Sequence, residues 1–283
     1  MVIDFHTHTF PEKIVDKAVA TLASNSGTSA FAVATVNGLL DSMQKSGVDR
    51  AVILPVATAP RQVEHINDAS AQLNEEYADR GLFSLGAMHP DFSNYKHELA
   101  RVQELGLKGI KLHSVYQQID IDDMRTLQVL DRCAELGLIV VCHGGPDIGF
   151  PGLHHADVEK EYNALKAIPD VKIVLAHMGG WMQWDKALEL LPQTNAMIDT
   201  AFSLGTIPYR PEVARSKKPE EVQMLTEERF LEMVRVFGAD RILFGTDCPW
   251  SSQKAYVDAI RSYSLTAPER EAILHGNAER LLG

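Results

Sequence analysis

The chain alternates short apolar runs with longer stretches in which apolar and polar residues are mixed. Eight of the apolar runs are rich in Val, Ile and Leu and have the length of strands. Because most of them are apolar almost without interruption, they predict parallel strands that are covered on both faces. The expected strands are Val2–Phe5, Arg50–Pro55, Phe83–Met88, Gly109–His113, Leu138–His143, Val171–Ala176, Ala196–Asp199 and Arg241–Thr246.

Between these runs, apolar residues recur every three or four positions, which predicts amphipathic helices. Strands that alternate with helices predict βαβ units and a parallel sheet. Eight such units in one domain over residues 1–283 favour a closed (β/α)8 TIM barrel. No Gly-x-Gly-x-x-Gly motif follows the first strand to support an open dinucleotide-binding sheet instead. The clearest helices are Gln62–Ala78, Tyr95–Leu105, Met124–Leu136, Trp181–Leu191 and Glu228–Phe237.

Two intervals between strands are longer than the others. The interval after the first strand contains Ser24–Thr35, which is rich in Ser, Thr, Ala and Gly. The interval after the seventh strand contains Gly205–Thr226, which is rich in Pro and charged residues. Because both insertions follow a strand, they are expected above the C-terminal face of the barrel, where barrel enzymes bind their substrates.

Composition limits the partners and the compartment. The 283 residues carry a net charge of −11 and no block of Lys and Arg, so a small-molecule substrate is expected rather than nucleic acid or a membrane surface. The N-terminal residues lack the pattern of a signal peptide, and no apolar run approaches the roughly 18 residues of a membrane span. The three cysteines form no Cys-x-x-Cys pair, which favours a cytoplasmic protein. The sequence leaves open whether the chain forms a homo-oligomer.

The expected first strand leads directly into His6 and His8. Because side chains alternate along a strand, these histidines are expected to face the barrel interior, while Ile3 and Phe5 are expected to face the helices. Buried imidazoles need partners, so this pattern predicts either a metal site or histidines that are satisfied by hydrogen bonds. Asp4 lies on the face of His6 and is expected either beside the site or at the bottom of the barrel.

Three later strands also end in a polar residue that a turn follows directly. These residues are His143, His177 and Asp247. Because the C-terminal ends of barrel strands meet at one end of the central cavity, the three are expected to converge with the two histidines of the first strand. Histidine is a common zinc ligand, and a carboxylate completes such sites for zinc, manganese or iron. The convergence therefore favours a metal-dependent enzyme over a purely structural role.

These motifs together resemble the amidohydrolase superfamily. Within it, the local sequences are similar to the amidohydrolase-2 branch, which includes aminocarboxymuconate-semialdehyde decarboxylase and the resorcylate decarboxylases as well as hydrolases and lactonases. The resemblance spans nearly the whole chain and implies a TIM barrel with a metal site, but it does not specify the substrate. The matching segments are Ile3–His8, Gly109–His113, Ala176–Gly180, Phe244–Pro249 and Gly276–Leu282.

The resemblance implies a role for each strand-end residue. His6, His8, His143 and Asp247 are implied as ligands of one divalent metal, with zinc as the first choice and manganese or iron as alternatives. His177 is implied as the catalytic histidine beside the metal. A divalent metal lowers the pKa of its bound water and polarises a carbonyl group. Asp247 would then accept a proton from that water, and His177 would stabilise an oxyanion or transfer a proton.

Lys111 has two interpretations. It shares a face of the fourth strand with His113, so both side chains are expected to point inward. Its position resembles the carboxylated, metal-bridging lysine of two-metal members such as dihydroorotase, in which case Lys111 and His177 would hold a second metal. The alternative is a cationic lysine that pairs with a carboxylate of the cavity, such as Asp247, or with the substrate.

The second insertion contributes one further candidate, Arg210. It lies within a group of basic residues that is unusual in so acidic a chain. Because a guanidinium group binds carboxylates through two parallel hydrogen bonds, Arg210 is expected to bind a substrate carboxylate. The alternative is an ordinary solvated charge.

The combined interpretation is a metal-dependent hydrolase. It would use a metal-activated water on a small amide, ester or lactone that carries a carboxylate. The alternative is a metal-dependent, non-oxidative decarboxylase of an aromatic or muconate-type acid, which would use the same ligands. A barrel that only binds a ligand is disfavoured because the set of metal-ligating residues is complete.

Overall fold

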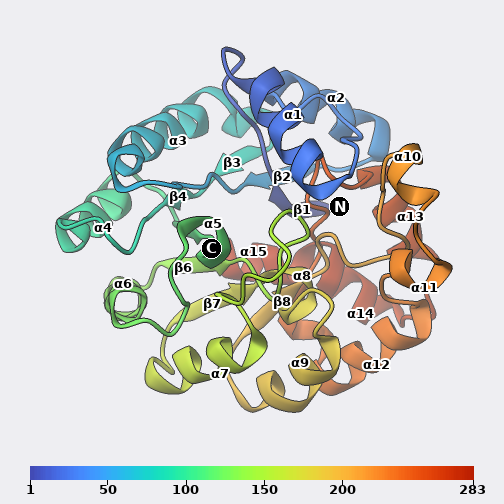
Figure 1. Ribbon diagram of the computed structural model, residues 1–283. Helices are drawn as coiled ribbons and strands as arrows, with labels where there is room; N and C mark the ends of the chain where they lie inside the picture. Colours follow the sequence, from blue (N-terminus) through green and yellow to red (C-terminus); the bar gives the residue numbers. More distant parts are fainter.

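The computed structural model describes residues 1–283, with the exception of the side chain of Pro219. The described chain forms a ring of strands inside a circle of helices (Figure 1). The strands form two sheets of three and six strands, and neighbouring strands within each sheet pair in parallel. The strands are β1 (Ile3–Thr7), β2 (Arg50–Ile53), β3 (Leu82–Ser84), β4 (Gly86–Ala87), β5 (Gly109–Leu112), β6 (Ile139–Cys142), β7 (Lys172–Leu175), β8 (Met197–Asp199) and β9 (Ile242–Leu243).

Backbone hydrogen bonds close this ring. The predicted third strand is divided at Leu85 into β3, which pairs with β2, and β4, which pairs with β5. The N–H of Leu85 donates to the carbonyl of Ile53 at 3.0 Å and so bridges the division. At the other junction, the N–H of Phe5 donates to the carbonyl of Phe244 at 2.8 Å and joins β1 to the end of β9. The prediction of a (β/α)8 barrel is therefore confirmed.

The five helices expected from the sequence are present as α3 (Val63–Tyr77), α4 (Tyr95–Glu104), α6 (Met124–Leu136), α9 (Trp184–Leu190) and α12 (Glu227–Phe237). α9 begins later than expected because φ is 150° at Gly180 and 58° at Met182, which interrupts the helical backbone. None of the described helices is long and apolar enough to cross a membrane. The other α-helices are α1 (Val15–Ser26), α2 (Val36–Ser46), α5 (Ser114–Gln117), α7 (Val158–Ala167), α8 (Ala176–Gly179), α10 (Pro211–Ala214), α11 (Pro219–Val222), α13 (Gln253–Ser262), α14 (Ala267–Glu271) and α15 (Asn277–Leu282).

Apolar side chains pack on both sides of the ring. The larger cluster lies between the strands and the outer helices, and the smaller cluster joins the inner faces of the strands to Ala278 of α15. Ile3 and Phe5 belong to the smaller cluster, so the prediction that they face the outer helices is wrong. The pairing register of β1 with β2 shifts between Asp4 and Thr7. This irregularity interrupts the alternation of side chains that the prediction assumed.

The two insertions contact each other at the edge of the barrel. An antiparallel bridge joins Thr28 to Tyr209, and the N–H of Arg210 donates to the carbonyl of Gly27 at 2.8 Å. Gly27 has a φ of 70°, which a residue with a side chain adopts only with strain. Ser26 and Thr28 line the cavity described below, as expected for an insertion near the substrate site. Ser26 ends α1 rather than lying in a loop.

Candidate metal centre

A cavity of about 960 Å³ lies at the C-terminal ends of the strands. Its walls combine strand ends with residues of α1, α3 and the loop that follows β6. The structure brings all five predicted strand-end residues to this cavity, and their chemical roles stay predictions. These residues are His6, His8, His143, His177 and Asp247.

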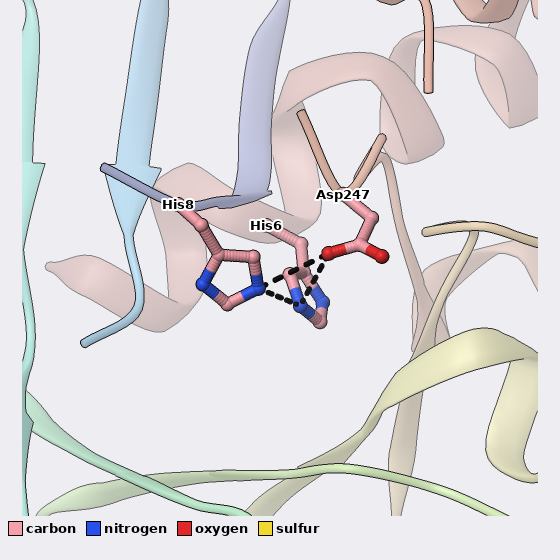
Figure 2. A group of neighbouring side chains, drawn as sticks. All are labelled: His6, His8 and Asp247. Carbon is pink, nitrogen blue, oxygen red and sulfur yellow. Dashed lines mark hydrogen bonds and ion pairs between the residues drawn. The ribbon is translucent and has the colours of Figure 1, made fainter. Parts of the chain in front are cut away.

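Three of these residues form a compact triad, His6–His8–Asp247 (Figure 2). The Nε2 of His8 lies 3.0 Å, and the Nε2 of His6 3.6 Å, from Oδ1 of Asp247. The two Nε2 atoms are 3.2 Å apart. Ligand atoms that bind one ion at about 2.0–2.2 Å in tetrahedral geometry lie roughly 3.3–3.6 Å from one another. The spacing of the triad therefore fits a divalent metal ion.

The other ring nitrogens of the two histidines have acceptor partners. The Nδ1 of His6 lies 2.7 Å from Oδ2 of Asp199, and the Nδ1 of His8 lies 2.8 Å from the carbonyl oxygen of Leu54. Because each Nδ1 donates its hydrogen, each neutral ring keeps a lone pair on Nε2. Two lone pairs and a carboxylate oxygen then face one another, an arrangement that a bound cation stabilises. The donor chemistry of the triad thus fits a metal as well as its spacing does.

Asp199 was not predicted as a site residue. It ends β8, at the same place on its strand as the predicted residues on theirs, so the signal was available in the sequence. Its Oδ1 accepts the backbone N–H groups of His177 at 3.0 Å and Ala201 at 3.1 Å. Burial raises the pKa of Asp199, and the charges of His177 and Lys111 oppose that shift. Asp199 therefore orients His6 and also fixes the backbone of His177.

The backbone is strained at two site residues. φ is 60° at His177 and 65° at Asp247, in the left-handed region that is costly for residues other than glycine. The chain just before Asp247 also lies very close to β1. A Cβ at Gly245 would lie only 2.9 Å from the Cβ of His6. The strained backbone at His177 and Asp247 lowers the stability of the fold, and such strain is common at functional sites.

Asp4 lies directly behind the triad. Its carboxylate accepts the backbone N–H of His6 at 3.2 Å and the hydroxyl of Thr246 at 2.6 Å. The side-chain amide of Gln253 donates to the same carboxylate at 2.7 Å. Burial raises the pKa of Asp4 to about 7, although these hydrogen bonds lower it. Asp4 therefore lies beside the site, which was one of its two expected places. The contacts of Asp4 join β1 to the segment that carries Asp247.

The protonation states of the site suit metal binding. Burial lowers the pKa of His6 and of His143 well below the ordinary histidine value, so both rings are neutral at pH 7. Burial raises the pKa of Asp247, but its contact with His8 and the neighbouring imidazoles outweigh burial and hold that pKa below its ordinary value. Neutral imidazoles and an ionised carboxylate are the forms that bind metals.

His143 belongs to a different group from the triad. Its Nδ1 lies 3.0 Å from Nε2 of His177, and its Nε2 lies 3.9 Å from Oδ2 of Asp147. Together with His113 and Asp147, His143 forms a second cluster on the wall of the same cavity, and the potential ligand atoms of this cluster are close enough together to bind a metal ion. The predicted set of four ligands is therefore divided in this structure, since His143 faces the second cluster and the other three face one another.

His177 lies beside the triad, where the catalytic histidine was predicted. Its ring centroid is 5.3 Å from that of His6. Its Nδ1 donates to the carbonyl of Ala201 at 2.9 Å, so Nε2 keeps the lone pair and faces His143. Nε2 of His177 therefore accepts the Nδ1 hydrogen of His143, and the two rings form a hydrogen-bonded pair at the cavity wall.

Lys111 points into the cavity, as predicted, together with His113. Its side chain is fully buried, and burial lowers its pKa. The negative charges that act on it are Asp199 and Asp247. This position is compatible with both interpretations of Lys111, the carbamate and the buried cation.

The structure places Arg210 outside the residues that line the cavity. Its Nε lies 3.4 Å from a carboxylate oxygen of Glu212. This position does not favour the predicted role in binding a substrate carboxylate. Two basic residues that were not predicted, Lys13 and Lys17, line the cavity instead, one turn apart at the start of the α1 region.

Glu161 on α7 holds the loop that follows His143, because its Oε1 accepts the N–H of Gly145 at 3.2 Å. Its Oε2 is buried and has no hydrogen-bond partner among the described residues. Burial raises the pKa of Glu161 well above its ordinary value of 4.5. The fold therefore binds the proton more tightly than the unfolded chain does, and the wild type loses stability as pH rises above about 4.5 towards the folded-state pKa.

Glu161→Gln mimics the protonated acid and is expected to escape this loss. The free energy of unfolding of the variant relative to the wild type should rise as pH increases from about 4.5 towards the folded-state pKa of Glu161, by up to about 1.4 kcal/mol per pH unit. Urea unfolding at several pH values measures this difference. Glu104→Gln, at an exposed position at the end of α4, is the matched control. A difference that does not change with pH would show that Glu161 is ionised in the fold.

Comparison with protein families identifies the class of this chain. The amidohydrolase family model Amidohydro_2 matches residues 3–283. The chain therefore belongs to this amidohydrolase family, as its motifs predicted. A related protein is the 2-amino-3-carboxymuconate-6-semialdehyde decarboxylase of Dictyostelium discoideum, which is 25% identical over 249 residues. The match covers 78% of this chain and 66% of that protein, just under two thirds of its length.

Solved structures of TIM-barrel amidohydrolases share the fold. The 5-carboxyvanillate decarboxylase of Sphingomonas paucimobilis has a TM-score of 0.71 and 18% identity, with 99% of this chain and 98% of that chain covered. A dihydroxybenzoic acid decarboxylase of a Polaromonas species, solved with manganese and the inhibitor 2-nitroresorcinol, has a TM-score of 0.70 and 16% identity, with 99% and 96% covered. At these identities the likeness establishes the fold alone.

Proposed function

We propose that this protein is a metal-dependent, non-oxidative decarboxylase of aromatic acids. The observation that carries the proposal is the His6–His8–Asp247 triad on a cavity with many aromatic side chains. Flat apolar walls suit a planar ring, and the triad suits a metal that binds the carboxylate of that ring. The aromatic residues that line the cavity are Phe10, Tyr116, Phe150, Trp181, Phe202 and Trp250.

The comparisons support the decarboxylase over the hydrolase that the sequence favoured first. The relatives from Dictyostelium, Sphingomonas and Polaromonas are all decarboxylases by name. The names of the latter two describe carboxylated aromatic rings as their substrates. A hydrolase and a decarboxylase can use the same metal ligands, so the triad alone does not separate them. The decarboxylase, expected as the alternative, is therefore the function that we propose.

The triad would hold one divalent ion, with zinc or manganese as candidates. Two imidazoles and one carboxylate suit either ion. Manganese is present in the Polaromonas structure. When bound, such an ion would neutralise and orient the substrate carboxylate and an adjacent ring oxygen.

Asp247 is the proposed proton carrier. Loss of CO2 from an aromatic carboxylate replaces a C–C bond with a C–H bond, so one proton must reach the ring carbon. Because the pKa of Asp247 is held below its ordinary value, its carboxylate is ionised at rest and would first have to take up the proton that it passes to the ring carbon. His177, whose Nε2 is an acceptor in the same cavity, would relay protons between solvent and Asp247.

Release of CO2 tests this function directly. Metal-loaded protein is incubated with carboxyl-labelled benzoates that carry hydroxyl, amino or methoxy groups, and labelled CO2 is measured. A parallel assay in ¹⁸O-water follows a panel of amides, esters and lactones. We expect labelled CO2 from at least one aromatic acid and no solvent oxygen in the product. Solvent oxygen in a hydrolysis product, without CO2 release from any acid, would favour the hydrolase instead.

For Lys111 we expect a cation that binds the substrate rather than a carbamate. Lys111→Met keeps the volume of the side chain but removes its charge. The metal content per chain is expected to stay the same, while KM for the acid rises about 10- to 100-fold, as for loss of a buried charged hydrogen bond. Metal analysis and steady-state kinetics measure the two effects. A fall from two metals to one, with activity partly restored by added short carboxylic acids, would establish the carbamate.

A further inference from the structure

A second polar group lies on the wall of the cavity that holds the triad. It consists of Asp147, in the loop after β6, and His113, directly after β5, and we call it the Asp147–His113 pair. Both residues line the cavity, and their exposed fractions are only 8% and 6%. The chemistry proposed above uses neither of them.

One carboxylate oxygen of Asp147 is fixed and the other is available. Oδ1 accepts the backbone N–H of Gly149 at 2.7 Å. The ion-pair contacts of Oδ2 among the described residues are Nε2 of His113 at 3.6 Å and Nε2 of His143 at 3.9 Å. Both distances exceed the range of an N–H···O hydrogen bond. An acceptor oxygen that is open to the cavity and has no side-chain partner within hydrogen-bond distance is a place where a ligand can donate a hydrogen bond.

His113 presents a donor next to this acceptor. Its Nδ1 accepts the backbone N–H of Tyr116 at 3.3 Å, so the neutral ring carries its hydrogen on Nε2, towards Asp147. Burial lowers the pKa of His113 well below the ordinary value, which favours that neutral ring. Tyr116 and His143 stack on the ring with centroid distances of 3.7 Å and 4.2 Å, and these contacts fix its orientation.

The same tautomer argues against a metal at the second cluster. A metal bound to Nε2 of His113 requires a lone pair on that atom and therefore a hydrogen on Nδ1. That hydrogen would face the N–H of Tyr116, and two donors would then oppose each other. The Asp147–His113 pair is thus arranged for hydrogen bonding rather than for a second ion, although its spacing alone would allow one.

We propose that the Asp147–His113 pair is a recognition subsite for a hydroxyl group on the aromatic ring of the substrate. A hydroxyl can donate to Oδ2 of Asp147 and accept from Nε2–H of His113 at the same time, whereas a methoxy oxygen only accepts. An acid without the hydroxyl leaves a buried carboxylate oxygen unpaired, and sites of this kind reject such analogues strongly. The inference rests on the proposed function, because it takes an aromatic acid as the occupant of the cavity.

Calorimetric binding to the metal-loaded protein tests the subsite without relying on turnover. The probes are benzoate, the three hydroxybenzoates and the three methoxybenzoates. The wild type is expected to bind at least one hydroxybenzoate about 10- to 100-fold more tightly than benzoate, as for a hydrogen bond to a charged group. In Asp147→Ala this preference should fall to within about threefold. Asp91→Asn, at an exposed position outside the cavity, is the matched control.

Asp147→Asn makes the test sharper and covers the case in which the alanine variant does not fold. Its oxygen can keep the hydrogen bond from Gly149, which places the amide NH2 where Oδ2 lay. Two donors would then face the ligand, so the preference should shift from the hydroxybenzoate to the matching methoxybenzoate. A hydroxyl preference that survives in both variants, or is missing from the wild type, overturns the subsite.

Metal analysis of the same samples separates the remaining outcomes. Unchanged metal content in both Asp147 variants agrees with recognition, whereas a loss of metal would make Asp147 a ligand and overturn the subsite. A wild type with an Asp147-dependent hydroxyl preference but no CO2 release would refute the decarboxylase and leave the subsite standing. CO2 release without that preference would refute the subsite and leave the decarboxylase standing.

Discussion

Replacing His6 and His8 together with alanine is expected to leave a folded protein without its tightly bound divalent metal and without measurable decarboxylation. The two Nε2 atoms are two of the three ligand atoms in the triad, and Asp247 alone offers a single carboxylate. Because the proposed reaction needs the metal to orient the substrate, its loss should reduce turnover more than any other change considered. Elemental analysis after desalting without chelator, combined with the CO2 assay, measures both effects.

The double variant needs a control for the loss of two imidazoles. His97 and His275 lie outside the cavity lining, and His275 contacts Glu279 at 2.8 Å, so alanine at both positions removes comparable side chains from the surface. The triad variant should also lose some stability, about 1–3 kcal/mol, because Asp199 is left buried without its partner His6. Full metal occupancy in the folded triad variant would place the metal elsewhere, with the second cluster around His143 as the first alternative.

The convergence of the strand-end residues could be predicted because two simple rules place them. A parallel strand that is covered on both faces is apolar throughout, so a polar residue at its end is conspicuous, and barrel geometry brings such ends together. His143, His177 and Asp247 followed from these rules and line one cavity. Asp199 obeys them too, but its strand is short and no turn signal of Gly or Pro follows it, so it was less conspicuous.

Side-chain directions along β1 could not be predicted from alternation. The shift of register between Asp4 and Thr7 accompanies contacts that are distant in sequence, such as the hydrogen bond from Thr246 to Asp4 across 242 positions. The close approach of Gly245 to His6 belongs to the same junction. Local patterns contain no information about such contacts, so Phe5 was assigned to the wrong face.

The insertions set a similar limit. The sequence predicted both near the substrate-binding end of the barrel, but only the first contributes residues to the cavity lining, and no described residue of Gly205–Thr226 does. Which side chains of an insertion face a cavity depends on how the insertion packs. Arg210 lies outside the lining, whereas Lys13 and Lys17 line it. Asp147 was missed for the same reason, because it lies in the loop after β6 and not on a strand. Periodicity predicts the faces of regular elements and gives no direction to loop residues.

Asp247→Asn is expected to separate proton transfer from metal binding. The amide keeps the shape of the side chain and one oxygen for the metal, but it cannot carry the proton that the ring carbon must receive. The backbone should tolerate the change, because φ is 65° at this position and Asn adopts the left-handed region at least as readily as Asp. Loss of a general acid–base group costs about 10²- to 10⁴-fold in rate, so kcat should fall by that factor while KM changes little.

The decisive measurement is kcat of the Asp247→Asn protein at full metal occupancy, with the metal content of each sample determined alongside. Asp258→Asn is the matched control, since Asp258 is exposed, pairs with Lys254 on the surface of α13 and lies outside the cavity lining. If the metal-replete Asp247 variant turned over at nearly the wild-type rate, the proton would have to come from another group. His177 would then be the residue to replace, because its Nε2 is an uncharged acceptor beside the same triad. A rate that falls only in proportion to lost metal would instead assign Asp247 to ligation alone.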